Sequence, residues 1–301
     1  MKTSIIIKII LLLFVSNIYG LKPDSTYNIR PNKYALMYKE YKIKTLDGYT
    51  LNAWFYPAQK EPTLDTAKYY FEKKTLIRSF DIENINKPTI IICDGDANNM
   101  SPHVGYAYNY CTNGFNVITF DWRGFGESEH FHIDNNYLVY PEFIIDYNAI
   151  VDFATQLQTV DVERIGVFGY STGAFLSFAI ASQRSEVKAI VVRGLFTDYK
   201  SLIPNLNKIF PEKNLIYPVG IDKYSPRSNW ETFNKSIFLI VGDLDVRTPK
   251  ENSIEILSHI KSNVRELWIV DKAGHGGFDA PEVLFPELFY KKTIRFFKEN
   301  L

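Results

Sequence analysis

The chain has 301 residues, of which 46% are hydrophobic and 23% are charged, and its 34 basic side chains balance 34 acidic ones. Because nucleic-acid binding needs an excess of positive charge, this neutral composition argues against a nucleic-acid partner. With only two cysteines, Cys93 and Cys111, the fold must depend on a large apolar core rather than on a disulfide framework. We expect the two thiols not to pair, because Cys93 ends a strongly apolar run.

The first twenty residues have the pattern of a signal peptide. Lys2 and Lys8 stand before an uninterrupted apolar run over Ile9–Val15, and the small residue Gly20 offers a cleavage position. The run is too short for a transmembrane helix, which takes about 20 apolar residues. We therefore predict that residues 1–20 are removed, that the protein is secreted or periplasmic, and that it does not stay inserted in a membrane. An uncleaved N-terminal anchor or a buried helix is the alternative.

The remaining residues, 21–301, are predicted to form one domain. Two alternating runs, Tyr41–Thr45 and Thr50–Tyr56, are joined through Asp47-Gly48, which is typical of an antiparallel hairpin. Six apolar runs then alternate with helical stretches, which predicts a mostly parallel sheet with covered faces. The runs are Thr89–Cys93, Phe115–Asp121, Arg164–Tyr170, Val187–Val192, Ile237–Val241 and Glu266–Val270. The helices are expected over Tyr140–Leu157, Ala174–Ala181, Pro249–Ile260 and Pro286–Glu299.

Two segments do not fit this alternation. Residues 60–87 are polar and long for a connection in a compact domain, so we expect local structure there. Residues 194–235 contain four prolines, which a single long helix cannot accommodate, and they are predicted to form a small cap of short pieces. Apolar side chains of this segment, among them Phe196 and Phe210, could line a substrate pocket or pack on the sheet.

A Gly-x-Ser-x-Gly motif stands at the end of one predicted strand. Arg164–Tyr170 runs directly into the motif at residues 169–173, and a predicted helix follows. The glycines permit a turn so sharp that side chains beside Ser171 would clash, and the turn lifts the serine hydroxyl above the sheet. A helix N-terminus also favours developing negative charge. A chance Gly-Ser-Gly turn is the alternative, but the coincidence of strand, turn and helix favours a nucleophile.

A nucleophilic serine needs a base and an orienting acid, and candidates for both follow in the expected order. Asp245 lies in the loop after the Ile237–Val241 strand, and His275 lies in a glycine-lined loop after the last strand. Asp243 competes for the role of the acid, with a turn-forming role as its alternative. A plain surface-loop histidine is the alternative for His275. The order and context of the residues predict a triad of Ser171, His275 and Asp245.

These residues closely resemble the α/β-hydrolase superfamily, from about Tyr41 to the C-terminus. Gly242, Asp245 and Pro249 match the family's Gly-x-x-Asp pattern with a proline four residues after the acid, which selects Asp245. Residues 121–128 match the family's Asp-x-Arg-Gly-x-Gly-x-Ser turn. The resemblance implies an α/β-hydrolase fold with a mostly parallel central sheet, an N-terminal antiparallel hairpin, helices on both faces and a short cap.

One motif departs from the family pattern. Relatives carry His-Gly-Asn-Ala-Gly-Asn after the third strand, whereas this chain has an aspartate at the first and third positions, Asp94 and Asp96. The resemblance implies an oxyanion hole made of the backbone N–H groups of Asp96 and Thr172, and backbone donors survive a change of side chain. Two nearby carboxylates would oppose an oxyanion unless they were paired, protonated or turned away. Arg193 is a candidate partner, with a plain surface arginine as the alternative.

The resemblance implies a serine hydrolase that cleaves carboxylic esters through an acyl-enzyme on Ser171, with a small-molecule ester or amide as substrate. A serine aminopeptidase-like peptidase, in which Asp94 and Asp96 hold a substrate ammonium, is one alternative. A non-catalytic binding protein on a hydrolase fold is another. Asp94, Phe196 and Phe210 are candidates for the substrate pocket, and no metal or cofactor is expected.

Three other histidines are interpreted as solvated loop residues. His130 and His132 lie on one side of an extended segment and could bind zinc, but no further cysteine or histidine has ligand spacing. His103 receives the same interpretation.

Overall fold

The structure is a computed structural model that describes residues 20–61, 86–93 and 95–301. Residues 1–19 lie outside this part of the chain, as do most of the polar 60–87 segment and Asp94. The predictions of a signal peptide and of a pocket role for Asp94 therefore stay predictions.

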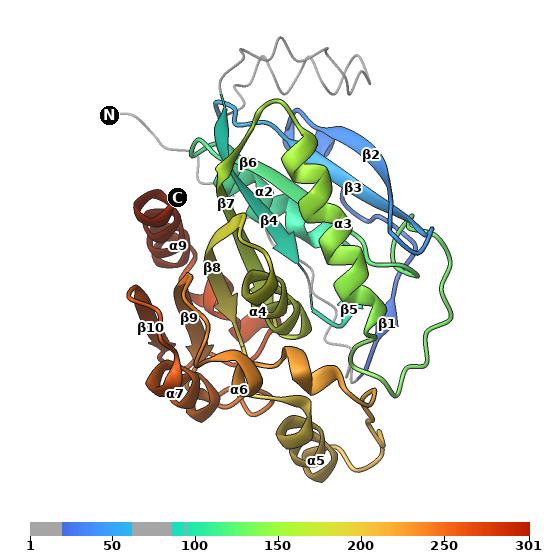
Figure 1. Cartoon of the computed structure of the whole chain (residues 1–301), viewed down its shortest axis with the longest axis vertical. Coiled ribbons are helices and arrows are strands. Elements are labelled where there is room, and N and C mark those ends of the chain that lie inside the picture. Colours follow the sequence, from blue (N-terminus) through green and yellow to red (C-terminus); the bar gives the residue numbers. More distant parts are fainter. Residues whose placement is uncertain (1–19, 62–85, 94) are drawn as a thin grey trace.

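Eight strands form the central sheet, in the order β10-β9-β8-β7-β4-β6-β3-β2 (Figure 1). The pairs β2–β3 and β3–β6 are antiparallel, and all other neighbours in this sheet are parallel. This confirms the predicted mostly parallel sheet with an N-terminal hairpin. The strands are β2 (Lys39–Lys44), β3 (Thr50–Tyr56), β4 (Lys87–Cys93), β6 (Asn116–Phe120), β7 (Val160–Tyr170), β8 (Val187–Arg193), β9 (Ser236–Gly242) and β10 (Arg265–Val270).

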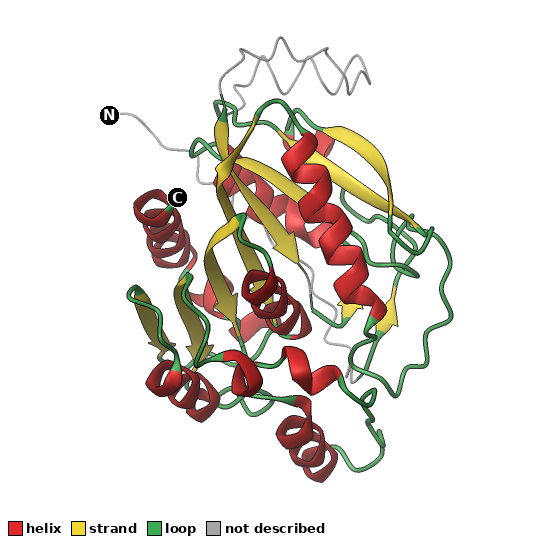
Figure 2. Ribbon diagram, in the orientation of Figure 1, coloured by secondary structure: helices red, strands yellow, loops and turns green. Residues whose placement is uncertain are grey.

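Helices cover both faces of this sheet (Figure 2). Buried side chains of α3, α4 and α7 belong to one apolar cluster, and those of α2 and α9 belong to a second cluster on the opposite face. In β4, Ile91 and Cys93 join the first cluster while Ile90 and Ile92 join the second, as the two-residue period of a strand requires. The main helices are α2 (Val104–Cys111), α3 (Glu142–Gln156), α4 (Thr172–Gln183), α7 (Lys250–His259) and α9 (Pro286–Asn300).

The segment over residues 194–235 consists of short helices. It contains α5 (Tyr199–Ile209), the 3-10 turn η3 (Ile221–Tyr224) and α6 (Pro226–Asn229). Pro204 lies within α5, whose apolar side chains Leu202 and Leu206 are buried. Because α5 lies beyond the end of the sheet in Figure 1, it can border a site at the carboxyl ends of the strands.

Shorter elements complete the described chain. Strands β1 (Lys22–Pro23) and β5 (Ala97–Asn98) pair in parallel as a separate two-stranded sheet. The remaining pieces are η1 (Pro31–Tyr34), η2 (Ser101–His103), η4 (Gly277–Asp279) and α8 (Pro281–Leu284). Cys93 and Cys111 are both buried, and no disulfide joins them.

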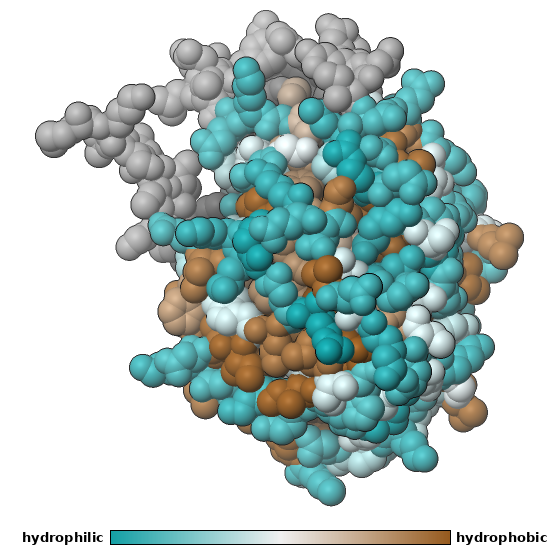
Figure 3. Space-filling model, turned by 60° about the vertical axis from the view of Figure 1, so that its left-hand side comes forward, coloured by the Kyte–Doolittle hydropathy of each residue, from teal (hydrophilic) through white to brown (hydrophobic). Residues whose placement is uncertain are grey.

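The face of the molecule in Figure 3 is mainly polar, with hydrophobic residues gathered in its lower half. Within the described part of the chain, none of the helices combines the length and the apolar character that crossing a bilayer requires.

Candidate active site

The turn that carries Ser171 lies between β7 and α4. Ser171 adopts φ 54° and ψ −119°, a conformation that residues with a side chain rarely adopt. Its N–H donates to the Arg193 carbonyl oxygen at 2.9 Å, which fixes the turn to the end of β8. A Cβ at Gly169 would lie 2.4 Å from both the Gly173 carbonyl oxygen and Ser177 Oγ, so only glycine permits this close approach of α4 to β7.

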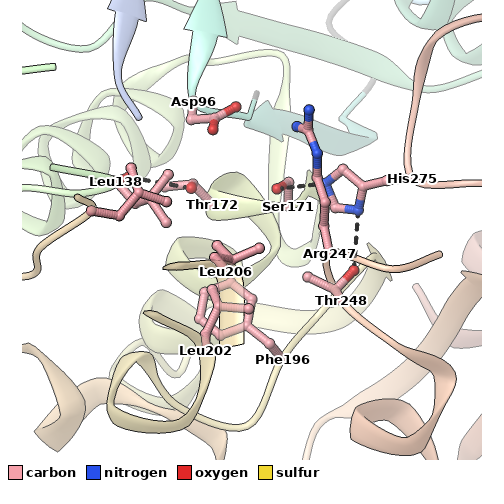
Figure 4. Close-up of a pocket in the computed structure, with 11 residues that line it drawn as sticks. Asp96, Leu138, Ser171, Thr172, Phe196, Leu202, Leu206, Arg247, Thr248 and His275 are labelled. Atoms are coloured by element: carbon pink, nitrogen blue, oxygen red, sulfur yellow. Dashed lines mark hydrogen bonds between the residues drawn. The ribbon is translucent and has the colours of Figure 1, made fainter. Parts of the chain in front are cut away.

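The three predicted triad side chains meet at the carboxyl ends of β7, β9 and β10. Nε2 of His275 lies 3.0 Å from Oγ of Ser171, a contact drawn in Figure 4. Nδ1 of His275 lies 2.8 Å from Oδ2 of Asp245. The side chains of His275 and Asp245 are only 8% and 2% exposed, so water competes little for these hydrogen bonds.

The carboxylate of Asp245 is held by the loop that follows it. Oδ1 accepts the backbone N–H groups of Arg247 and Thr248, both at 2.9 Å, and Oδ2 accepts the Thr248 hydroxyl at 2.8 Å. Burial alone would raise the pKa of Asp245, but His275 and the hydrogen bonds from Thr248 outweigh it and hold this pKa below its ordinary value. An ionised Asp245 therefore faces Nδ1 of His275.

The rival acid, Asp243, lies elsewhere in the same loop. Its N–H donates to the Val270 carbonyl oxygen at 3.0 Å, and its Oδ1 has no hydrogen-bond partner among the described residues. The hydrogen bonds of the described chain connect His275 to Asp245 and not to Asp243.

Thr248 is a site residue that the sequence did not suggest. Its Oγ1 lies 3.1 Å from Nδ1 of His275 as well as 2.8 Å from Asp245 Oδ2, so it contacts both members of the pair. Pro249 is the N-cap of α7 and no side chain caps that helix, so the local sequence carries no signal for Thr248 beyond its place in the loop after Asp245.

A pocket of about 360 Å³, measured with its open mouth, lies over Ser171. In Figure 4, Asp96 and the guanidinium of Arg247 lie on one side of Ser171, and Phe196 and Leu206 lie on the other. The pocket therefore has a charged end and an apolar end, with the serine between them. The lining residues are Asp96, Leu138, Ser171, Thr172, Phe196, Leu202, Leu206, Leu215, Arg247, Thr248 and His275.

The two predicted oxyanion-hole residues, Asp96 and Thr172, both line this pocket. Thr172 is the first residue of α4, and its hydroxyl donates to the Leu138 carbonyl oxygen at 3.2 Å. Both residues thus lie beside Ser171, as the prediction requires. Their role as oxyanion donors stays a prediction.

The loop that carries Asp96 is fastened by the first described residues of the chain. The N–H of Lys22 donates to the Asp96 carbonyl oxygen at 2.8 Å, and the N–H of Asp24 donates to that of Asn98 at 2.9 Å. The side-chain amide of Asn99 donates back to the carbonyl oxygen of Asp24 at 2.9 Å. The segment after the predicted signal peptide therefore holds the Asp96 loop in place.

The structure separates the two aromatic pocket candidates. Phe196 is buried and lines the pocket. Phe210 lies outside the lining and packs, partly buried, against the apolar cluster on the α3 and α4 face of the sheet. It directly follows Ile209, the last residue of α5, as the C-cap of that helix.

Two side chains for which we considered a surface position are buried. Arg193 is 3% exposed and forms an ion pair with Glu282 at 2.9 Å, so the interpretation as a plain surface arginine is wrong. His103 is 3% exposed, with its ring 6.1 Å from that of Tyr106, so it is not a solvated loop histidine. For Arg193, the partner Glu282 comes from a distant part of the chain, which the local sequence does not reveal. His130 and His132 are exposed, as expected.

Residues 88–215 match the family model of the α/β-hydrolase fold. An uncharacterised 31.7 kDa protein of Escherichia coli, from the traX–finO intergenic region, is 35% identical over 123 residues, or 40% of this chain. Those residues are 41% of the relative, so the chain spans about two fifths of that protein's length. The uncharacterised protein Rv2307c of Mycobacterium tuberculosis is 22% identical over 258 residues, which cover 86% of this chain and 78% of the relative.

Solved structures share the same fold. The esterase Pf2001 of Pyrococcus furiosus has a TM-score of 0.69 and 21% identity, covering 94% of this chain and 99% of that one. A putative dipeptidyl aminopeptidase IV of Bacteroides ovatus has a TM-score of 0.64 and 19% identity, covering 88% of this chain and 36% of that one. At such identities the likeness establishes the architecture alone. The eight-stranded sheet and the family match over residues 88–215 show that the chain has the α/β-hydrolase fold.

Proposed function

We propose that this protein is a serine hydrolase that cleaves small carboxylic esters through an acyl-enzyme on Ser171. The observation that carries the proposal is the unbroken chain of contacts from Ser171 Oγ to His275 Nε2 at 3.0 Å and from His275 Nδ1 to Asp245 at 2.8 Å. A non-catalytic binding protein would have no need of this alignment beneath a pocket.

The proposed reaction follows from this geometry. Nε2 of His275 takes the hydroxyl proton as Ser171 Oγ attacks the ester carbonyl, and Asp245 stabilises the imidazolium that forms. The N–H groups of Asp96 and Thr172 are the proposed donors to the tetrahedral oxyanion. His275 then gives the proton to the leaving alcohol, and the acyl group stays on Ser171. A water molecule, deprotonated by His275, releases the acid and restores the hydroxyl.

The two ends of the pocket suggest how the ester lies. Phe196, Leu202 and Leu206 form the apolar end, which suits the acyl chain. Asp96 and Arg247 form the charged end, which suits a polar alcohol group. Because the side chains that form the apolar end are themselves buried and closely packed, we expect short and medium acyl chains to be preferred over long ones.

A peptidase is the second candidate, because Asp96 lines the pocket and a carboxylate there could bind a substrate ammonium. The structural likeness to a putative dipeptidyl aminopeptidase IV is compatible with this reading. An ester substrate has no such ammonium, so the two candidates differ in what Asp96 does.

Matched substrates test the proposal. We expect the purified protein to hydrolyse 4-nitrophenyl acetate, butyrate and octanoate, and to cleave aminoacyl 4-nitroanilides much more slowly. Faster cleavage of the anilides would favour the peptidase. Failure to turn over either series, with Ser171 unreactive, would favour a binding protein.

A further inference from the structure

Arg193 connects the Ser171 turn with the His275 loop. Its backbone carbonyl oxygen accepts the N–H of Ser171 at 2.9 Å, and one guanidinium nitrogen, Nη1, donates to the backbone carbonyl oxygen of His275. One residue at the end of β8 therefore fixes the backbones that carry the proposed nucleophile and the proposed base.

The guanidinium is held from two further sides. Its second terminal nitrogen, Nη2, lies 2.9 Å from Oε1 of Glu282 in α8, and the Tyr106 hydroxyl donates to the same oxygen at 2.8 Å. The guanidinium carbon lies 3.6 Å from the centre of the Tyr170 ring, whose centre is 5.2 Å from that of His275. The Tyr170 ring thus lies close to both the cation and the imidazole.

The pair is poorly explained as a device for stability. Nε of Arg193 and Oε2 of Glu282 are buried without a hydrogen-bond partner among the described residues. Buried ion pairs contribute little to stability when apolar side chains could take their place, and an incompletely bonded pair contributes less. The position of the Arg193–Glu282 pair next to the His275 loop, rather than a gain in stability, accounts for the presence of this buried pair.

We propose that Arg193, held by Glu282, is a positioning residue that fixes the His275 loop relative to the Ser171 turn and sets the balance of charge behind the imidazole. This inference rests on the proposed function, because it assigns a role in the reaction of Ser171. Arg193 does not touch the substrate pocket and carries no step of the chemistry itself.

The charge balance predicts opposite effects for the two partners. Without Glu282, the cation behind His275 is uncompensated and disfavours the imidazolium. Without Arg193, the carboxylate is uncompensated and favours the imidazolium. Other charged or titratable groups also lie around His275, and they stay constant in this comparison. They are Asp245 and Arg247 after β9, Tyr170 at the end of β7, Asp96 in the pocket, Tyr106 in α2 and Asp279 beside Gly274.

The test is a pH titration of the His275 imidazole by NMR in the full-length protein, with ester kinetics on the same samples. For Glu282→Gln we expect the His275 pKa to fall by about one unit, and for Arg193→Met we expect it to rise by a similar amount. Arg193→Lys keeps the charge but not the two-sided hydrogen bonding, so kcat should fall about tenfold or more while KM changes less than about twofold.

The buried Arg123, which does not line the pocket over Ser171, supplies the matched control. Arg123→Lys should lower the midpoint of thermal unfolding but leave kcat per folded molecule and the His275 titration unchanged. If Arg193→Met does not fold, Arg193→Lys and Glu282→Gln carry the test. Unchanged kcat in Arg193→Lys together with an unshifted titration in Glu282→Gln would overturn the inference. Because the titration needs no turnover, opposite shifts would support the charge balance even if no ester were hydrolysed.

Discussion

Arg123 and Arg193 are both buried, but the hydrogen bonds around them differ. The Arg123 guanidinium makes four hydrogen bonds to two carboxylates, Asp146 and Asp47, at 2.6 to 2.9 Å. The Arg193 guanidinium reaches one carboxylate and the backbone of His275, and its Nε has no partner in the described chain.

The comparison distinguishes charged groups that stabilise the fold from charged groups that lie beside the proposed active site. Around Arg123, all the guanidinium nitrogens are bonded, and the cluster ties the turn after β6 to α3 and to the β2–β3 hairpin. Around Ser171, the charged side chains of Asp96 and Arg247 line the pocket itself. Substitutions in the first region should therefore change stability, and those in the second should change turnover.

Among the substitutions around Ser171, Ser171→Ala and His275→Ala should cause the largest loss of activity. Each should lower kcat by roughly 10⁴-fold or more, and the double variant should lose little beyond either single one, because the residues act as a unit. Steady-state kinetics on a 4-nitrophenyl ester measure this loss, and thermal unfolding is the control. A large fall in the unfolding midpoint with modest loss of kcat would assign these residues to the fold.

Asp245→Asn and Asp243→Asn compare two acids of one loop. We expect Asp245→Asn to lower kcat about 10³- to 10⁴-fold and Asp243→Asn to have a mild effect, because only Asp245 is bonded to His275. A more damaging Asp243→Asn would show that the acid is assigned wrongly.

The same pair predicts a pH effect on stability. The pKa of Asp245 is lowered in the fold, so its stabilising contribution is present above about pH 4, its unfolded value, and is lost as pH falls through the lower folded value. Asp245→Asn should therefore flatten the decline of the unfolding free energy below pH 4, which denaturant titrations at several pH values would measure. An unchanged acid decline would contradict the assigned shift.

Arg123→Met tests whether the cluster of Arg123, Asp146 and Asp47 stabilises the fold. Removing the cation leaves the buried carboxylate of Asp146 unpaired, which should lower the free energy of unfolding by about 3 to 5 kcal/mol. Chemical denaturation measures the loss, and kcat per folded molecule should stay within about twofold. Asp47→Asn, at the partly exposed partner, should give a smaller loss in the same direction. A reduced kcat in fully folded Arg123→Met would contradict the prediction that Arg123 affects stability but not turnover.

Phe196→Ala and Phe210→Ala sharpen the boundary of the pocket. Phe196 lines the apolar end, so its loss should change the ratio of kcat/KM between butyrate and octanoate esters by about tenfold. Phe210 packs outside the lining, and its loss should leave that ratio unchanged in folded protein. Equal effects of the two substitutions would mean that both act through the core.

Asp96→Asn should have the smallest effect on neutral esters. It keeps the backbone N–H but removes a charge near the developing oxyanion, so kcat/KM should stay the same or rise a few-fold. If Asp96 binds a substrate ammonium, the same variant should spare neutral esters but lose much of its kcat/KM on aminoacyl substrates. A large loss on neutral esters would contradict both readings.

The sequence predicted the elements whose signals are local. The parallel strands appear as short apolar runs because both faces of the sheet are buried, and Ser171 is marked by the glycines that its turn requires. The Arg193–Glu282 pair joins residues far apart along the chain and leaves no local pattern. The two-residue strands β1 and β5 are too short to show a period, so the fastening of the Asp96 loop was also missed.

Reaction with a fluorophosphonate, followed by mass spectrometry of the intact and digested protein, tests most directly whether Ser171 is the nucleophile. We expect a single adduct on Ser171, no adduct in Ser171→Ala, and a labelling rate reduced by orders of magnitude in His275→Ala. A wild-type protein that does not react, or that reacts at another residue, would contradict the proposal that Ser171 is a nucleophile activated by His275.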